Sequence, residues 1–201
     1  MNRRSLILAP LALAALALPA AAQPLSLTEI SRYFNGITAA ESEFTQINPD
    51  GTIATGTLRI LRPGRMRFEY DPPMGGLVIA GGQQVAIFDP KSNQGPTEYP
   101  LRRTPLNLIL AANIDLNRER MVVRHYQEGE ATVVVAQDPE HPDYGSIRLL
   151  LTGNPTELRQ WRVTDDMGRE TTVILGGLRT GMTFPTRLFS IVHESEIRAG
   201  N

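Results

Sequence analysis

The stretch "LRILRPGRMRFEYDPP", residues 58–73, decides the fold, because two short segments of alternating apolar and charged residues meet there at Pro63 and Gly64. Alternation with a period of two predicts β-strands that each bury one face. Proline followed by glycine between the two segments predicts a turn. We therefore expect a β-hairpin whose strands bring their apolar faces together.

The length of the connecting loop determines which faces meet. A two-residue turn at Pro63 and Gly64 would place Arg62 opposite Arg65, so that an apolar face would meet a charged one. A three-residue loop, or a bulge near Gly64, would place Arg62 opposite Met66 and bring the apolar residues together. We predict this odd-length loop, which leaves Arg62 at the rim of the apolar face. That face consists of Leu58, Ile60, Met66, Phe68 and Tyr70.

A guanidinium beside an apolar face needs hydrogen-bond acceptors, because burying a charge without partners costs several kcal/mol. No acidic residue is obviously in register with Arg62, so backbone carbonyls at the end of a covering helix or loop are the expected acceptors. Such bonds could hold a lid closed and could be broken to open it. The alternative is an arginine that extends from the strand end into water.

The first 23 residues, "MNRRSLILAPLALAALALPAAAQ", combine two arginines, an apolar run and three alanines. This pattern is typical of a secretory signal peptide, and the apolar run is short for a membrane span. We expect cleavage after Ala22; an uncleaved membrane anchor is the alternative. Loss of Arg3 and Arg4 with the leader would leave 179 residues, of which 18 are basic and 21 acidic. The resulting net charge of −3 gives no broad basic surface, so we expect no nucleic-acid partner.

The chain contains no cysteine. This excludes disulfide bonds, thiol catalysis, cysteine-ligated metal and a lipid anchor on an N-terminal cysteine. We expect an exported protein that is not attached to a membrane after export. Residues 23–201 are expected to form a single domain with a sizeable core.

The residues that follow the predicted cleavage site have the pattern of an α-helix. Ser26 and Glu29 have the spacing of a capping box, and Gly36 can end the helix. The apolar residues that follow Ser26 at helical spacing are Leu27, Ile30 and Phe34. One amphipathic helix should therefore precede the strands.

From residue 41 onward the period changes to two. Five segments within residues 42–89 and five within residues 121–175 are short, rich in β-branched and aromatic residues, and separated by turn-forming residues. About ten or eleven strands with hairpin connections predict a curved antiparallel sheet or an incomplete β-barrel. The fold class is therefore mainly β, with a few short helices that cover the sheet.

Residues 104–112, between the two strand sets, predict a short helix. Thr104 can cap this helix, and Pro105 can occupy its first position. The helix is apolar nearly all round, so it either plugs the core or covers an apolar surface. The residues expected to face that surface are Leu106, Ile109 and Leu110.

Signals for catalysis are weak. The three histidines, His125, His141 and His193, show no metal-ligand spacing. The chain has no serine elbow of the "GxSxG" type, and its glycine clusters lack the phosphate-loop pattern. Charged residues on the predicted strands leave no lipid-facing band of an outer-membrane barrel. We therefore expect no enzyme, no cofactor and no metal.

Several motifs follow one another in a defined order: "LTEISRYFNGI", "AESEFTQ", "GTLRILRPGRMRFEYDPP", "GLVIAGGQQVAIFDP", "TPLNLIL" and "VTDDMGRETTVIL". This ordered set resembles the periplasmic outer-membrane lipoprotein carrier proteins of the LolA family over most of the mature chain. Its most specific part is the Phe-x-Gln strand, the Arg-Pro hairpin and the glycine-rich strand that ends in Asp-Pro. The stretch from Met182 onward lacks the proline pattern of some relatives.

The resemblance implies a half-barrel in the periplasm that carries the acyl chains of lipoproteins from the inner to the outer membrane. It places the arginine that latches the lid at Arg62, the acyl-chain cavity on the apolar face of the hairpin, and the lid helix at residues 104–112. The implied partners are acylated lipoproteins, an inner-membrane ABC-type lipoprotein-releasing complex and an outer-membrane lipoprotein receptor. We expect a monomer. The alternative on the same half-barrel is an envelope-stress sensor that binds a lipoprotein or a peptide.

Overall fold

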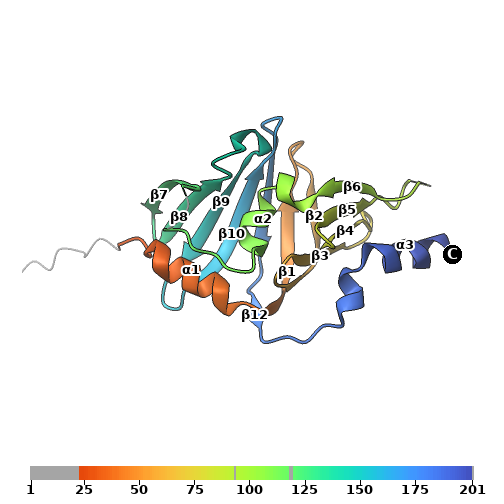
Figure 1. Cartoon of the computed structure of the whole chain (residues 1–201), viewed down its shortest axis with the longest axis horizontal. Coiled ribbons are helices and arrows are strands. Elements are labelled where there is room, and N and C mark those ends of the chain that lie inside the picture. Colours follow the sequence, from red (N-terminus) through yellow and green to blue (C-terminus); the bar gives the residue numbers. More distant parts are fainter. Residues whose placement is uncertain (1–22, 93, 118–119, 201) are drawn as a thin grey trace, which may run out of the picture.

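The computed structural model of the protein describes residues 23–92, 94–117 and 120–200. The chain forms one antiparallel sheet (Figure 1). Helices α1 (Leu27–Gly36) and α2 (Leu106–Leu110) lie against one face, and helix α3 (Ile191–Ala199) lies beside strand β4 (Leu77–Gly81). We call the face under α1 and α2 the inner face and the opposite one the outer face. The predicted signal peptide and its cleavage after Ala22 lie outside the described residues. Within those ranges, every helix is too short or too polar to cross a membrane.

Helix α1 (Leu27–Gly36) begins and ends as the sequence predicts. The Ser26 hydroxyl accepts from the Glu29 N–H at 3.2 Å, and the Glu29 carboxylate accepts from the Ser26 N–H at 2.8 Å. These two bonds complete the predicted capping box. Ile30 and Phe34 are buried in the main core, so the apolar side of α1 packs on the sheet.

The sheet has twelve strands in the described part of the chain, against the ten or eleven predicted. The two strands that the sequence did not indicate, β6 and β12, have only four and two residues, too few to show a period of two. The first set comprises β1 (Ala39–Ile47), β2 (Ile53–Leu61), β3 (Arg65–Tyr70), β4 (Leu77–Gly81), β5 (Gln84–Phe88) and β6 (Thr97–Pro100). The second comprises β7 (Val122–Glu128), β8 (Ala131–Gln137), β9 (Ser146–Thr152), β10 (Glu157–Thr164), β11 (Glu170–Leu175) and β12 (Arg179–Thr180).

The strand order is β6-β5-β4-β3-β2-β1-β11-β10-β9-β8-β7, and β12 also pairs with β1. Strands β1–β6 and strands β7–β11 are therefore each a run of hairpins, and the two runs join where β1 pairs with β11. Among the described residues neither β6 nor β7 has a second strand neighbour, so the sheet stays open. The predicted open antiparallel architecture is confirmed.

The β2–β3 hairpin has the predicted odd-length loop, which consists of residues 62–64. The predicted pairing of Arg62 with Met66 is wrong, because Arg62 is part of the loop and Ile60 pairs with Met66 instead. The observed register differs from the predicted one by an even number of residues on β2. Each side chain therefore stays on its predicted face of the sheet, and the apolar faces still meet. Gly64 has φ 70°, a left-handed conformation that favours glycine, and it closes the loop.

Aromatic side chains link the two strand sets on the inner face. The ring centroids of Phe44 and Phe68 lie 5.1 Å apart in an edge-to-face arrangement, and those of Phe68 and Trp161 lie 6.2 Å apart. Phe44 is on β1, Phe68 on β3 and Trp161 on β10, so this cluster spans the junction of the two sets. Its rings are buried together with the apolar side of α1.

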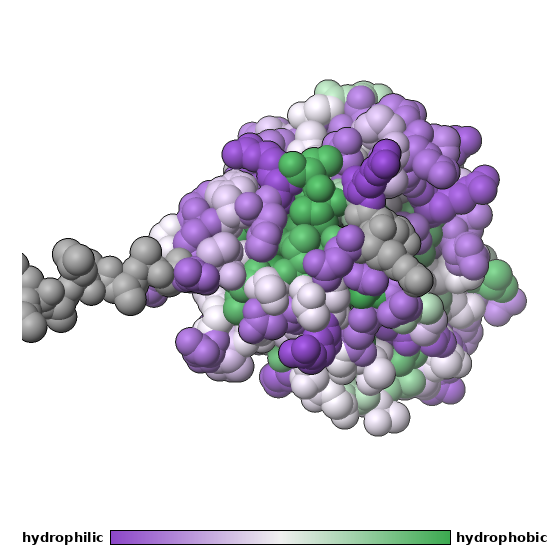
Figure 2. All heavy atoms as spheres, turned by 60° about the vertical axis from the view of Figure 1, so that its left-hand side comes forward, coloured by the Kyte–Doolittle hydropathy of each residue, from purple (hydrophilic) through white to green (hydrophobic). Residues whose placement is uncertain are grey.

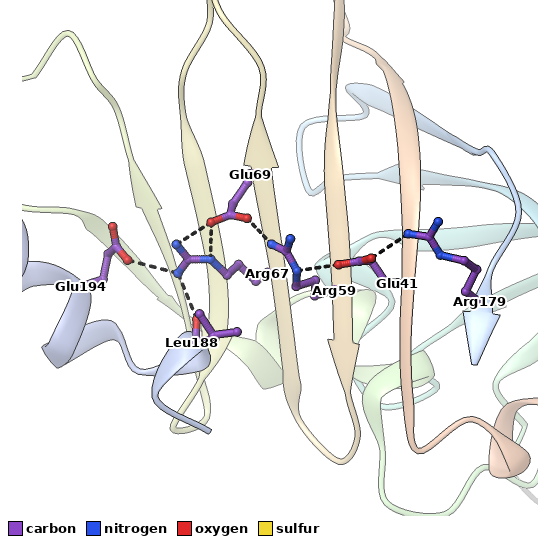
Figure 3. Close-up of polar contacts among 7 residues, drawn as sticks. All are labelled: Glu41, Arg59, Arg67, Glu69, Arg179, Leu188 and Glu194. Atoms are coloured by element: carbon purple, nitrogen blue, oxygen red, sulfur yellow. Dashed lines mark hydrogen bonds and ion pairs between the residues drawn. The ribbon is translucent and has the colours of Figure 1, made fainter. Parts of the chain in front are cut away.

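A chain of ion pairs crosses the outer face from β12 to β3 (Figure 3). The Glu41 carboxylate accepts from Arg179 and from Arg59, at 2.7 and 2.8 Å. Glu69 in turn accepts from Arg59 and from Arg67. Opposite charges are therefore directly paired from β12 through β1 to β2. Arg59 and Arg67, which lie directly opposite each other on β2 and β3, are bridged by Glu69.

The C-terminal segment docks on the outer face, a contact that the sequence did not predict. It contains the 3₁₀ helix η3 (Thr186–Phe189) and helix α3 (Ile191–Ala199). Arg67, only 8% exposed, donates to the Leu188 carbonyl at 2.9 Å and to the Glu194 carboxylate at 3.1 Å (Figure 3). Arg67 therefore fastens the segment to β3.

A close backbone approach completes this docking. A Cβ atom at Gly81 would lie 2.1 Å from the Phe189 carbonyl oxygen, so only glycine allows η3 to lie this near β4. Ile191 of α3 then packs against a second, smaller core on the outer face. The buried members of that core are Leu77, Ile79, Ala86 and Phe88.

Candidate functional site

A cavity of about 720 Å³ lies at one end of the inner face. It is open to solvent on one side and is lined by β6, by the start of helix α2 (Leu106–Leu110) and by β3, β10 and β11. Its volume falls within the range of roughly 300–1,000 Å³ that is usual for small-molecule sites. Two other hollows, of about 470 and 450 Å³, are smaller and offer fewer apolar side chains.

The walls of the cavity are apolar and its rim is charged. Apolar wall residues are Phe68, Val78, Leu106, Trp161, Val163 and Val173. The charged residues of the rim are Arg103, Asp143, Asp165, Asp166 and Arg169. Two of them, Asp165 and Arg169, form an ion pair at 2.7 Å. Seen from the side that carries α1 and β7, the surface also shows a strip of apolar residues bordered by polar ones (Figure 2).

Tyr70 contributes the main polar group of the inner wall. Its hydroxyl donates to the Gln46 amide oxygen at 2.8 Å. Burial raises the pKa of Tyr70 to about 12, and the bond to Gln46 only partly opposes this effect. The wall is therefore uncharged here at physiological pH.

We expect the buried Tyr70 to make the fold less stable at alkaline pH. Its folded pKa of about 12 exceeds the value near 10 of an exposed tyrosine, so between these values the folded chain holds a proton that the unfolded chain loses. This contribution to stability is complete below pH 10 and is lost as the pH rises toward 12, with about 1 kcal/mol lost at pH 11. Urea denaturation at pH 9 and 11 should show a smaller alkaline loss in Tyr70→Phe than in the wild type. Equal losses in both proteins would contradict this assignment.

The structure separates the five residues that we expected to line the cavity. Phe68 and Tyr70 line it. Leu58, Ile60 and Met66 lie on the same face but are buried in the main core, which includes residues of α1 and α2. Contact of these three residues with a ligand stays a prediction, and it requires the helices to move.

Helix α2 is shorter than the helix predicted for residues 104–112. The 3₁₀ helix η1 (Leu101–Arg103) precedes it, and the Thr104 hydroxyl donates to the Leu101 carbonyl at 2.8 Å. Thr104 therefore closes η1 and does not cap α2, which corrects the prediction. Pro105 occupies the N-cap position without a side-chain bond.

The apolar residues of α2 point toward the core and the cavity. Ile109 and Leu110 are buried in the main core. Leu106 is half-buried and lines the cavity. α2 thus forms part of a roof over the inner face (Figure 1).

Arg62 connects the β2–β3 loop to both helices. Its guanidinium donates to the Phe34 carbonyl near the end of α1 and, at 2.5 Å, to the Ala111 carbonyl directly after α2. A longer contact of 3.4 Å reaches the Ile37 carbonyl. The acceptors are thus backbone carbonyls at helix ends, as the sequence led us to expect. At the C-terminal end of a helix the dipole also favours a cation.

The environment of Arg62 is only partly favourable. Burial lowers the pKa of its guanidinium, which nevertheless stays charged at physiological pH. Its Nε atom is buried without an acceptor among the described residues. A buried donor without a partner costs about 1–3 kcal/mol, and this cost offsets part of the free energy that the other hydrogen bonds of Arg62 contribute. Arg62 therefore joins the β2–β3 loop to the ends of α1 and α2, with one of its donors left unpaired among the described residues.

The part of the cavity wall that the second strand set supplies was not predicted from the sequence. Trp161 and Val163 alternate along the predicted strand that became β10, and this alternation was the available signal. Their position opposite Phe68 depends on the pairing of β1 with β11, which no local pattern indicates.

An open antiparallel sheet with an apolar hollow on its inner face and a roof of two short helices defines a half-barrel binding protein. The model of one family, described as outer membrane lipoprotein carrier protein LolA, matches residues 35–192. The chain therefore belongs to the LolA family.

Relatives with the name outer-membrane lipoprotein carrier protein are similar over most of their length. The protein of Leptothrix cholodnii is 27% identical over 180 residues, which cover 85% of this chain and 83% of the relative. The protein of Xylella fastidiosa is 25% identical over 170 residues, or 80% of each chain. Among solved structures, the fold is similar to that of a putative outer membrane lipoprotein-sorting protein domain from Vibrio parahaemolyticus, with a TM-score of 0.49 and 9% sequence identity. The match covers 82% of this chain and 94% of the domain.

Proposed function

We propose that this protein is a periplasmic chaperone that binds the acyl chains of lipoproteins and carries them from the inner to the outer membrane. The observation that carries the proposal is the apolar cavity of about 720 Å³ beneath a short helical roof in a member of the LolA family. Export through the predicted signal peptide, with cleavage after Ala22, would place the carrier between the two membranes.

The energetics of acyl chains require partners on both sides. Burying one methylene group gains about 0.8 kcal/mol, so a chain of roughly sixteen carbons gains on the order of 10 kcal/mol when it leaves water. A lipoprotein with several chains therefore needs an ATP-consuming complex, which we propose to be of the ABC type, to leave the inner membrane. Delivery requires an outer-membrane receptor that binds the chains more tightly, since each 1.4 kcal/mol changes partitioning tenfold.

We propose that Arg62 is the latch of the empty carrier. Its bonds to the Phe34 and Ala111 carbonyls hold the roof against the β2–β3 loop. Incoming acyl chains displace the apolar side chains of α2, namely Leu106, Ile109 and Leu110, and thereby weaken the bonds of Arg62. The chains then gain access to the core residues of the inner face, namely Leu58, Ile60 and Met66. Delivery of the cargo restores the closed form.

Trp161 provides a test of acyl-chain binding, because it is the single tryptophan of the chain and lines the cavity. Stearate that carries bromine atoms in mid-chain should quench its fluorescence saturably, and unbrominated stearate should compete without quenching. Val163→Phe, which narrows the cavity, should weaken both effects. Absence of saturable quenching would count against a lipid cavity.

The identity of the cargo needs a second measurement. Protein purified from the periplasm should carry acylated lipoproteins that are detectable by mass spectrometry. A chain that carries only free fatty acid would contradict a role in lipoprotein transport. The envelope-stress sensor is not favoured, since the relatives described above bear the carrier name; a co-purified signalling protein would reverse that conclusion.

A further inference from the structure

Helix α1 presents three polar side chains at positions i, i+3 and i+7, which lie on one side of a helix. These residues are Thr28, Ser31 and Asn35. All three contact the stretch that follows α2, residues 111–117, which we call the exit segment. The exit segment belongs to no helix or strand.

Asn35 holds the exit segment by two bonds to one residue. Its Nδ2 donates to the Ile114 carbonyl at 2.8 Å, and its Oδ1 accepts from the Ile114 N–H at 3.0 Å. The side-chain amide thus pairs with both backbone groups of Ile114, as a neighbouring strand would. Without such a partner these groups would lack the bonds that buried backbone requires.

Two further contacts extend the pairing along α1. The Ser31 hydroxyl accepts from the Leu116 N–H at 3.0 Å, and Asn117 donates to the Thr28 hydroxyl at 3.1 Å. Between these bonds the side chains of Ile114 and Leu116 are each only 4% exposed and pack into the main core. The exit segment is therefore fixed to α1 by its polar bonds and to the main core by its apolar side chains.

Residues 114–117 of the exit segment are held by bonds that do not involve Arg62. Arg62 reaches this part of the chain through the Ala111 carbonyl, at the start of the segment, and reaches Asn35 only through a long contact of 3.4 Å. Between Ala111 and Ile114 the chain makes bends with exposed or half-exposed residues and no regular structure. A hinge is therefore available between α2 and the fixed residues 114–117.

We propose that Asn35 is a positioning residue that anchors one end of the lid, so that α2 swings about residues 111–113 while residues 114–117 stay on α1. The proposal rests on the carrier function proposed above, because it assigns the fixed point about which the roof moves. Loss of the anchor lets the exit segment detach from α1, which gives bound acyl chains a second route for dissociation from the cavity. Its effect on retention is opposite in sign to the loss of the Arg62 latch.

Two measurements on the full chain test the anchor. Asn35→Leu should raise the hydrogen-exchange rate of the Ile114 amide at least tenfold while the amide of Leu149 on β9 is unchanged. It should also release mid-chain brominated stearate at least tenfold faster than the wild type, as followed by recovery of Trp161 fluorescence. Asn35 is exposed, so the substitution opens no hole in the core.

Related variants separate the anchor from a general loss of stability. Ser31→Ala removes only the bond to Leu116 and should accelerate release less than Asn35→Leu does. Asn35→Asp keeps the acceptor for the Ile114 N–H and should fall between Asn35→Leu and the wild type. Arg32→Gln, an exposed change on the same helix, should behave as the wild type.

The outcomes distinguish this proposal from the proposed function. If even the wild type binds no stearate, the carrier function fails, while exchange at Ile114 still reports on the anchor. Unchanged Ile114 exchange, or release from Asn35→Leu that is as slow as in the wild type, would overturn the anchor. If Asn35→Leu does not fold, the same readings in Asn35→Asp and Ser31→Ala decide the question.

Discussion

Arg62→Leu should trap lipoprotein on the carrier and slow its transfer to outer-membrane acceptor vesicles at least tenfold. The guanidinium stabilises the closed, empty form through its bonds to the Phe34 and Ala111 carbonyls. Each charge-assisted bond contributes about 1.5–3 kcal/mol, so their loss should favour the open, loaded form by well over tenfold. The chain should still fold, because Arg62 lies in a loop at the rim of the core and not within it.

Transfer should be measured with a radiolabelled lipoprotein loaded on each variant. Arg65→Leu is the matched control, since Arg65 lies on the same hairpin and its Nε donates within the hairpin to the Leu61 carbonyl. This control should transfer cargo at the wild-type rate. Normal transfer by Arg62→Leu would show that the latch plays no part in switching.

Arg67→Met should destabilise the fold by about 3 kcal/mol, the usual cost of removing one partner of a buried ion pair. The variant leaves the Leu188 carbonyl without its guanidinium donor and loosens Glu194 from the sheet. The docking of η3 and α3 should weaken, so that proteases cut residues 181–190 more readily. For a chain of this size the melting temperature should fall by about 10 °C.

An exposed ion pair supplies the control for Arg67. The side chain of Arg169 is 59% exposed in its pair with Asp165. Exposed pairs contribute about 0–1 kcal/mol, so Arg169→Met should leave the melting temperature nearly unchanged. Thermal unfolding followed by circular dichroism measures both variants. Equal, small shifts would mean that Arg67 does not hold the C-terminal segment.

Much of the fold follows from local patterns in the chain. The capping box of Ser26 and Glu29 starts α1 at the expected residue, and the ten strand segments with a period of two all form strands. The odd-length loop at Gly64 was predicted because an even loop would pair an apolar face with a charged one. The exact pairing was missed, since the sequence did not show that Arg62 itself belongs to the loop.

The candidate site was predicted less completely. Phe68, Tyr70 and Leu106 line the cavity, whereas Trp161, Val163 and Val173 were missed. The missed residues come from strands that reach the hairpin only through the pairing of β1 with β11. That pairing joins residues far apart in the chain, and period-two patterns carry no information about which strands become neighbours.

By itself the sequence determined the antiparallel strands, the first helix and the faces that they bury, because these depend on residues a few positions apart. Only the tertiary structure decided where the cavity lies, how Asn35 holds the exit segment and how α3 reaches the outer face. Those features depend on contacts between distant residues, such as Arg67 with Leu188, 121 positions apart. Such contacts form only when packing of the whole sheet brings their partners together, so no short stretch of the chain can specify them.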